Sequence, residues 1–113
     1  MDSLSLFKAL SDQTRLTSVV LIHSQQELCV CELMVGLDEI QPKVSRHLAL
    51  LKKQGVLCGR KQGQWVFYFL NPELPAWFIQ MLDQLVLEPQ NYQAALDRLN
   101  KMGDRPLRQT QCC

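Results

Sequence analysis

The segment Gln41-Pro42-Lys43-Val44-Ser45-Arg46-His47-Leu48, which continues to Lys53, predicts the helix that decides the fold. Val44, Leu48 and Leu51 recur at the spacing of a single helix face, and this apolar face can pack on a core. Pro42 suits the first turn of a helix, and Gly55 suits the end of one. Polar and basic residues fill most other positions, so the outer face of the helix is available to a binding partner.

A shorter helix is expected immediately before this one, over residues 28–36, with Gly36 ending it in the left-handed conformation. Residues 37–40 then form a brief turn. A short helix, a turn and a longer helix with a polar start are typical of a helix-turn-helix, whose second helix enters the major groove of DNA. Arg46 suits guanine and Gln41 suits adenine, although the same layout also occurs in helical hairpins that have only a structural role.

A β-hairpin is expected directly after the second helix, from strands over residues 56–60 and 65–70 that are rich in branched and aromatic residues. The turn between them, residues 61–64, contains Gly63 where a positive φ is needed. A hairpin with a basic tip after a DNA-reading helix is typical of a wing, which contacts phosphate or the adjacent minor groove. The residues expected to contact DNA are Gln41, Lys43, Ser45, Arg46, His47, Arg60, Lys61, Gln62 and Gln64.

The net charge of the 113-residue chain is only +1, but its charged residues are unevenly distributed. Between Ile40 and Pro72 there is no Asp or Glu, whereas six of the 12 basic residues lie there, namely Lys43, Arg46, Lys52, Lys53, Arg60 and Lys61. An ordinary solvated face usually carries both signs of charge. The absence of acidic residues therefore favours a surface that contacts phosphate.

Four more helices are expected outside this region: residues 3–10, Asp12 to about His23, residues 74–87 and residues 91–102. The helix at 74–87 carries more apolar residues than one packing face needs, so with the first helix it is expected to form a dimer interface. The residues assigned to that interface are Leu4, Phe7, Trp77, Phe78, Met81, Leu82 and Leu85. The expected fold is mainly α with a small β-hairpin: a dimeric winged helix-turn-helix over residues 1–102, followed by a flexible C-terminal tail over residues 103–113.

Cys29 and Cys31 lie two residues apart at the start of the first helix of the expected helix-turn-helix. On a regular helix such residues are separated by about 200°, so they can bind one ion together only if the helix unwinds locally. The helix dipole at this end is expected to favour thiolate and to lower the thiol pKa. The sequence shows no signal peptide and no membrane-spanning run, so we expect a cytoplasmic protein whose thiols remain reduced.

Four segments, in this order, resemble the ArsR family of metal-responsive winged-helix repressors, and the match covers about residues 4 to 87. They are Phe-Lys-Ala-Leu-Ser-Asp-Gln-Thr-Arg-Leu (7–16), Glu-Leu-Cys-Val-Cys-Glu-Leu (27–33), Gln-Pro-Lys-Val-Ser-Arg-His-Leu (41–48) and Arg-Lys-Gln-Gly-Gln-Trp-Val (60–66). The Cys-Val-Cys element is similar to that of the arsenite- and antimonite-responsive branch. The resemblance implies a cytoplasmic homodimer that represses a resistance operon and leaves its double-stranded operator DNA when As(III) or Sb(III) binds the thiolates of Cys29 and Cys31.

The chain also departs from other branches of that family. Relatives with a transition-metal site on the C-terminal helix need several His and carboxylate ligands, but only Glu73 and Asp83 are present there, so zinc is not expected. Cadmium- and lead-responsive relatives add cysteines in an N-terminal extension, and no cysteine precedes Cys29. Many arsenic-responsive members have a third cysteine where this chain has Met34. The third ligand would then be Cys58, Cys112 or Cys113, or a non-protein thiol or water.

Three other classes of protein are compatible with parts of this pattern. A thiol-redox-sensing winged-helix repressor would use the same fold, with Cys29 and Cys31, or Cys112 and Cys113, oxidised instead of metallated. A winged-helix module for protein interaction would not need an acid-free reading helix and wing. An enzyme is least expected, because the chain has no Cys-x-x-Cys motif, no phosphate-binding glycine loop and only two histidines. No organic cofactor is expected.

Overall fold

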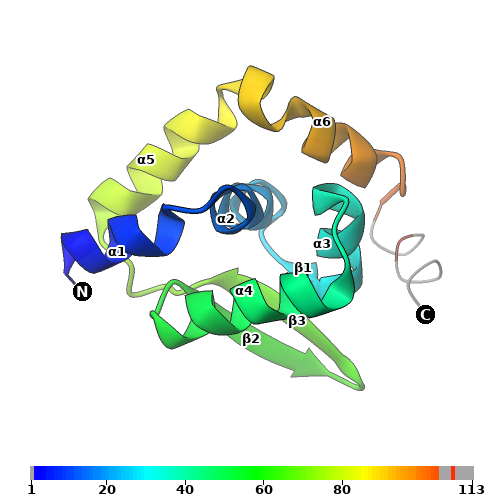
Figure 1. Ribbon diagram of the computed structural model, residues 1–113, viewed down its shortest axis with the longest axis horizontal. Coiled ribbons are helices and arrows are strands. Elements are labelled where there is room, and N and C mark those ends of the chain that lie inside the picture. Colours follow the sequence, from blue (N-terminus) through cyan, green and yellow to red (C-terminus); the bar gives the residue numbers. More distant parts are fainter. Residues whose placement is uncertain (1, 105–107, 109–113) are drawn as a thin grey trace.

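The computed structural model describes residues 2–104 and residue 108. Its elements follow in the order α1 (Ser3–Leu10), α2 (Gln13–Gln25), β1 (Leu28–Cys29), α3 (Val30–Leu37), α4 (Gln41–Lys53), β2 (Leu57–Gln62), β3 (Trp65–Leu70), α5 (Ala76–Val86) and α6 (Pro89–Asn100). In Figure 1, α2 is seen end-on at the centre, with α5 and α6 above it and α4 and the sheet below. The predicted winged helix-turn-helix is confirmed, with α3 and α4 as the helix pair and β2 and β3 as the wing.

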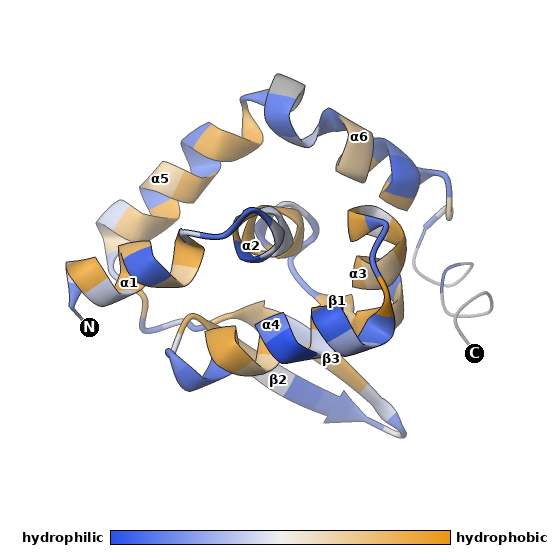
Figure 2. Ribbon diagram, in the orientation of Figure 1, coloured by the Kyte–Doolittle hydropathy of each residue, from blue (hydrophilic) through white to orange (hydrophobic). Residues whose placement is uncertain are grey.

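Helix α2 supplies the centre of the hydrophobic core. Its residues 19–22 are fully buried, as expected for a helix that is surrounded by other elements. Asp12 caps the helix as predicted, because its carboxylate accepts a hydrogen bond from the backbone N–H of Arg15 at 3.0 Å. Along α4 and α5, hydrophobic and hydrophilic bands follow one another (Figure 2), as expected for helices that bury one face and expose the other.

The reading helix α4 has the predicted inner face. Val44, Leu48 and Leu51 are fully buried. Pro42 lies in the first turn, where its missing N–H leaves no backbone hydrogen bond unmade. After the helix, Gly55 adopts a φ of 81°, which a residue without Cβ accepts readily. The inner face therefore anchors α4, and its polar outer face is left to solvent.

The helix predicted over residues 28–36 is wrong at both of its ends. Residues 28 and 29 form β1 instead, which pairs antiparallel with β3 through Leu28 with Tyr68 and Cys29 with Phe67. This pairing gives the buried backbone of β1 the hydrogen-bond partners that it needs. At the other end, α3 continues to Leu37, and Asp38 rather than Gly36 takes the left-handed conformation, with φ 55° and ψ 50°.

Position 36 requires a glycine for a different reason from the one predicted. A Cβ at this position would lie 3.0 Å from Cδ1 of Leu21. The glycine therefore allows α3 to approach α2 closely within the core, inside a helix that continues past it.

The sheet has three strands in the order β1-β3-β2, where the sequence predicted two. Gly63 adopts a φ of 63°, which confirms its predicted role in the turn. The turn itself is shorter than predicted: Lys61 and Gln62 still pair with β3, so only Gly63 and Gln64 join the wing strands. Phe67 in β3 faces Cys29 in β1 on one side and Arg60 in β2 on the other. Cys29, Phe67 and Arg60 thus form one row across the three strands, which connects β1 to the wing.

Helices α1 and α5 lie side by side (Figure 1), and the rings of Phe7 and Trp77 meet at a centroid distance of 5.4 Å. Within the described residues, no helix is both long and apolar enough to cross a membrane. Arg108, which lies in the segment predicted to be a flexible tail, is only 7% exposed. At that residue the C-terminal segment packs against the body of the protein.

Candidate functional site

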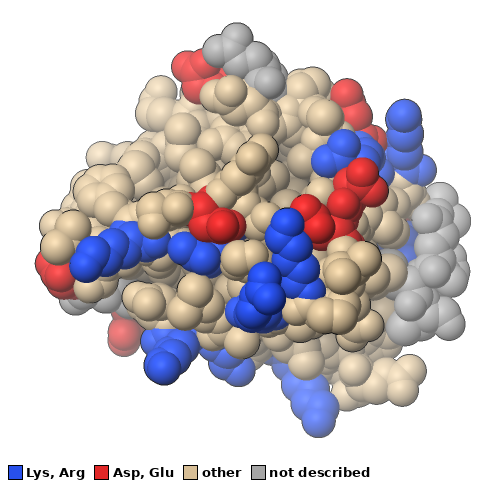
Figure 3. Space-filling model, in the orientation of Figure 1, with Lys and Arg blue, Asp and Glu red and all other residues tan. Residues whose placement is uncertain are grey.

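The face made by α4 and the wing presents most of the residues predicted to contact DNA. Lys and Arg side chains project from the lower edge of the molecule in Figure 3, where Figure 1 places these elements. Lys43 and Ser45 are half-buried, and the exposed members of the predicted set are Gln41, Arg46, Arg60, Lys61, Gln62 and Gln64. The exposed set is basic and polar, as a phosphate-contacting surface requires.

Two basic residues of this face are paired within the chain. The ammonium of Lys43 lies 2.8 Å from Oε1 of Glu39, one helical turn earlier. Arg60 forms a two-point contact with Glu27, from Nη2 to Oε1 at 2.6 Å and from Nε to Oε2 at 3.2 Å. The guanidinium of Arg60 also lies over the ring of Phe67, 5.0 Å from its centroid. Arg60 thus ties the wing to the segment that precedes β1.

His47 occupies a different environment from the one predicted. It is 8% exposed, and its Nδ1 lies 3.5 Å from Nη1 of Arg15 and 3.9 Å from Oδ1 of Asp12. Burial holds the pKa of His47 below its usual value, although the carboxylate of Asp12 opposes this shift. His47 therefore joins α4 to α2, and this position does not favour a direct contact with a base.

Cys29 and Cys31 line one cavity of about 480 Å³. The angular separation expected for two residues of one regular helix does not apply, because Cys29 lies in β1 with an extended backbone at φ −89° and ψ 171°, directly before α3. The prediction that the two thiols point to opposite sides of a helix is therefore wrong. The other residues that line the cavity are Val30, Met34, Gln41, Gln64, Trp65, Val66 and Tyr68.

The cavity brings the two cysteines next to both elements that the sequence predicted to contact DNA. Gln41 is the first residue of α4, and Gln64 belongs to the turn of the wing. Cys29 itself is paired with Phe67 of the wing strand β3. A ligand that bridges the thiols would thus lie against the start of the reading helix and the tip of the wing.

The thiol of Cys29 is harder to ionise than predicted. Burial raises the pKa of Cys29 to about 11, and the neighbouring carboxylate of Glu32 adds to the increase, while the backbone N–H of Glu32 opposes it. Cys29 is only 4% exposed, so the loss of hydration exceeds the effect of the helix dipole that the sequence suggested. Oε1 of Glu32 accepts a hydrogen bond from the backbone N–H of Cys29 at 3.0 Å.

The other cysteines do not line this cavity in the part of the chain that the structure describes. Cys58 is half-buried in β2, opposite Phe69 of β3. Cys112 and Cys113 lie outside the described residues. Among residues 2–104 and 108, no group of three or more His, Cys, Asp or Glu side chains is arranged to hold a metal ion. His23 is paired with Asp83, from Nε2 to Oδ1 at 2.5 Å, and so links α2 to α5.

The residues predicted to form a dimer interface divide into two groups. Leu4, Phe7 and Trp77 are exposed and form an apolar patch over α1 and α5, with Met81 and Leu85 half-buried beside it. Phe78 and Leu82 are fully buried within the single chain. Their assignment to the interface is wrong, because both side chains pack in the core of the single chain and leave no surface for a partner.

Two residues near the thiols were not identified from the sequence. Glu32 lies three residues after the capping residue Cys29, a spacing at which Glu often bonds back to the cap. That signal was present in the sequence. Arg108 donates a hydrogen bond from Nη1 to Oε2 of Glu32 at 3.3 Å. No local sequence pattern predicts a contact between residues so far apart in the chain.

Comparisons with known proteins agree with this arrangement. Residues 12–57 match the sequence model of a family described as bacterial regulatory protein, arsR family. The chain is 52% identical over 110 residues to the arsenic resistance transcriptional regulator ArsR2 of Pseudomonas putida, covering 96% of this chain and 95% of that protein. It is 53% identical over 81 residues to the arsenical resistance operon repressor of Escherichia coli K12, covering 72% and 69% of the two chains.

Solved structures show the same fold. HlyU from Vibrio cholerae N16961 superposes with a TM-score of 0.67 at 33% identity, over 75% of this chain and 91% of that one. The antimony-specific transcriptional repressor AntR superposes with a TM-score of 0.64 at 25% identity, over 80% of each chain. The fold and the sequence thus lead to the same group of DNA-binding regulators.

The raised pKa of Cys29 predicts slow alkylation at neutral pH. In the reduced protein, the rate at which iodoacetamide modifies Cys29 should increase about ten-fold per pH unit between about pH 7 and 10, because only the thiolate reacts. The measurement is the labelled fraction of Cys29 by tandem mass spectrometry. In guanidinium chloride, where the protein is unfolded, the rate of modification of Cys29 should stop increasing above about pH 9.5, as it does for an ordinary thiol. If the rate in the folded protein stops increasing at that same pH, the prediction is contradicted.

Proposed function

The chain belongs to the arsR family of bacterial regulatory proteins, and from this premise we propose that it is a metalloid-responsive transcriptional repressor. It binds double-stranded operator DNA as a homodimer. As(III) or Sb(III) bound by the thiols of Cys29 and Cys31 releases it. The observation that carries this proposal is the single cavity lined by both cysteines, by the first residue of α4 and by the turn of the wing.

A trivalent metalloid suits the donors of this cavity. Thiols without imidazole or carboxylate select soft ions. Each S–As bond that forms replaces an As–OH bond of arsenite, and the thiol proton leaves with the hydroxide as water. Capture of arsenite by Cys29 and Cys31 therefore needs no thiolate in advance, which agrees with the raised pKa of Cys29.

Cys29 and Cys31 supply two ligands, and the third ligand of the metalloid is still to be assigned. Met34 lines the cavity, but its thioether is a weaker donor than a thiol. Cys58 lies in β2, which is separated from β1 by β3, so it is poorly placed to reach the same ion. We assign the third position to Cys112 or Cys113 of the C-terminal segment, with a non-protein thiol or water as the alternatives.

Release follows from the place of Cys29 in the sheet. Drawing the sulfur of Cys29 toward that of Cys31 strains the two-residue pairing of β1 with β3 and the first turn of α3. Gln41 and the wing border the same cavity, so the reading helix and the wing change their relative positions. Operator DNA must then weaken the binding of metalloid by the same factor by which metalloid weakens the binding of DNA.

DNA contact is assigned to the exposed residues of α4 and the wing. Arg46 and Gln41 are placed at base edges in the major groove, and Lys61, Gln62 and Gln64 at the adjacent phosphates or minor groove. Lys43, Ser45 and Arg60 support this surface from less open positions. The exposed patch of Leu4, Phe7 and Trp77 is assigned to the homodimer interface, with Met81 and Leu85 at its border.

A thiol-redox-sensing repressor is the second candidate, because the same two cysteines lie together in one cavity. It differs in its inducer: peroxide would release the protein from DNA, and arsenite would not.

Replacing Cys29 or Cys31 with Ser should preserve operator binding and abolish release by arsenite. Each substitution removes one sulfur from the bridge and leaves the reading helix unchanged. The measurement is fluorescence anisotropy of a labelled operator complex, titrated under reducing conditions with As(III), Sb(III), Cd(II) and Zn(II). Cys58→Ser is the matched control and should respond like the unmodified protein. If the Cys29→Ser/Cys31→Ser double variant still dissociates normally, the proposed sensing site is wrong.

Replacing Arg46 with Ala should weaken operator binding by about 1–3 kcal/mol, because an exposed side chain that reads a base edge is lost. The measurement is operator affinity at several salt concentrations. Lys101→Ala removes a charge from the end of α6 and should leave the affinity nearly unchanged. An Arg46→Ala protein with the same affinity and salt dependence would exclude Arg46 from the interface.

Replacing Trp77 with Glu should dissociate the homodimer and reduce operator affinity together, because it places a charge in the apolar patch over α1 and α5. Analytical ultracentrifugation gives the mass of the assembly, and anisotropy gives the affinity. Val35→Glu puts the same charge on an exposed apolar position of α3 and should leave the dimer intact. A Trp77→Glu protein that remains dimeric would show that this patch is not the interface.

A further inference from the structure

A buried ion pair connects the C-terminal segment to the start of α3. Nη1 of Arg108 lies 3.3 Å from Oε2 of Glu32. Glu32 is 2% exposed and Arg108 is 7% exposed. Two charged groups with so little contact with water stay in place only when they satisfy each other. The pair therefore acts as a fixed structural link.

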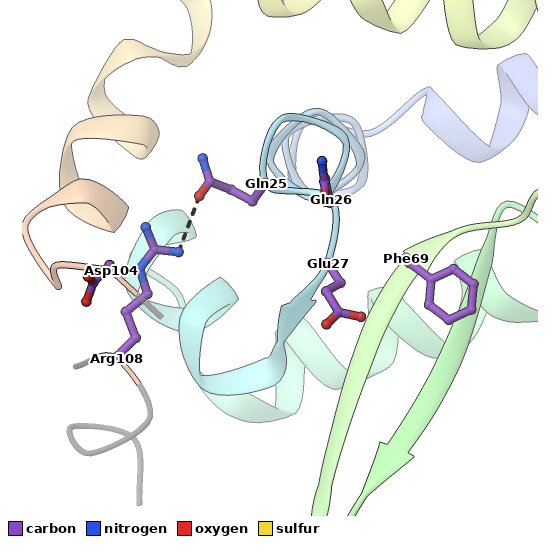
Figure 4. A pocket seen from close by; sticks show the side chains of 6 residues that line it. All are labelled: Gln25, Gln26, Glu27, Phe69, Asp104 and Arg108. Atoms are coloured by element: carbon purple, nitrogen blue, oxygen red, sulfur yellow. Dashed lines mark hydrogen bonds between the residues drawn. The ribbon is translucent and has the colours of Figure 1, made fainter. Parts of the chain in front are cut away.

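Arg108 is held in its position by two further contacts. Its Nε donates a hydrogen bond to the carbonyl oxygen of Gly103 at 2.7 Å. Its Nη1 also lies 3.3 Å from Oε1 of Gln25, at the end of α2. Figure 4 shows this guanidinium reaching from the C-terminal segment toward Gln25, beside the cavity that Asp104 and Glu27 also line. The guanidinium is thus aimed at Glu32 by contacts on both sides.

The other oxygen of Glu32 reaches the thiol site. Oε1 accepts the hydrogen bond from the backbone N–H of Cys29, at 3.0 Å. One carboxylate therefore joins Arg108 to the residue that caps α3 and carries the buried thiol. If Arg108 were removed, Glu32 would be left as an uncompensated buried charge, and it would turn away from Cys29 or draw in water.

We propose that Arg108 and Glu32 are positioning residues for the metalloid site: Arg108 fixes the carboxylate of Glu32, and Glu32 fixes the backbone of Cys29 so that its sulfur stays in the cavity beside Cys31. This inference rests on the proposed function, since it concerns how the same two thiols are held. It adds a part of the chain far from the helix-turn-helix to the sensing site.

The chain offers a matched control at the other end of the same helix. Nε of Arg98 in α6 donates a hydrogen bond to the carbonyl oxygen of Gly36 at 3.1 Å. Arg98 and Arg108 thus both tie the C-terminal part of the protein to α3, but only Arg108 is connected to Cys29. Replacing either arginine would loosen α3 in general, whereas only replacing Arg108 would release Cys29 from its position.

The experiment measures metalloid affinity in the absence of DNA. Reduced protein is titrated with As(III), and binding is followed by the ultraviolet absorption of the sulfur–arsenic bonds. Arg108→Gln should weaken As(III) binding about 10- to 100-fold, the usual effect of losing a residue that orients a metal ligand. Arg98→Gln should stay within about two-fold of the unmodified protein. Arg108→Lys, which keeps the charge, should recover part of the loss.

A double variant tests the route through Glu32. Glu32→Gln/Arg108→Gln replaces the buried ion pair with neutral groups of similar shape, so it should fold even where the single Arg108 variant does not. The single variants Glu32→Gln and Arg108→Gln are measured beside it. If the two residues act as one unit, the double variant should lose no more As(III) affinity than whichever single variant binds more weakly. Additive losses would overturn the proposal, as would Arg108→Gln with unchanged As(III) affinity or Arg98→Gln with an equal loss.

A last comparison separates this route from a direct effect on the C-terminal cysteines. In a Cys112→Ser/Cys113→Ser background, Arg108→Gln should still weaken As(III) binding by a similar factor. If the effect disappears there, Arg108 acts through those thiols and its assignment to Cys29 is wrong. Failure of the proposed function would look different, because the unmodified protein itself would then ignore As(III) or remain on its operator.

Discussion

The antiparallel pairing of Cys29 with Phe67 is the constraint on which the connection between the cysteine cavity and the proposed DNA-binding surface depends. It places a thiol in the same sheet as the wing and makes α3 begin at residue 30. A two-residue strand has little stability of its own. Here it is held by the burial of Leu28 and Cys29 and by the bond from Glu32. A small pull on Cys29 therefore acts at once on α3 and on the wing.

Local signals were enough to predict most of the fold. Asp12, Pro42 and Gly63 each mark an end or a turn through their own chemistry, and the apolar spacing of α4 gave its inner face. Residues 28 and 29 were misassigned because two residues carry no periodicity, and their pairing partners come much later in the chain. The contact of Arg108 with Glu32 spans 76 positions, so only the folded chain reveals it.

The acid-free segment from residue 40 to 72 shows both the value and the limit of charge patterns. It correctly marked the basic face of the protein. In the folded chain, however, acidic residues from outside the segment approach it: Glu27 pairs with Arg60, Glu39 with Lys43, and Asp12 lies near His47. A sequence free of acid is therefore not a surface free of acid, and the members of the predicted set differ in how available they are.

The pairing of Arg60 with Glu27 has a consequence for the ions around the DNA. If Arg60 binds a DNA phosphate, as proposed, it exchanges the carboxylate of Glu27 for another oxyanion, so less of its positive charge is newly applied to the duplex. Condensed counterions leave DNA in proportion to the phosphates that a protein neutralises. The carboxylate of Glu27 stays nearby and offsets part of that charge. Fewer ions should therefore leave the DNA than the number of basic side chains on this face suggests.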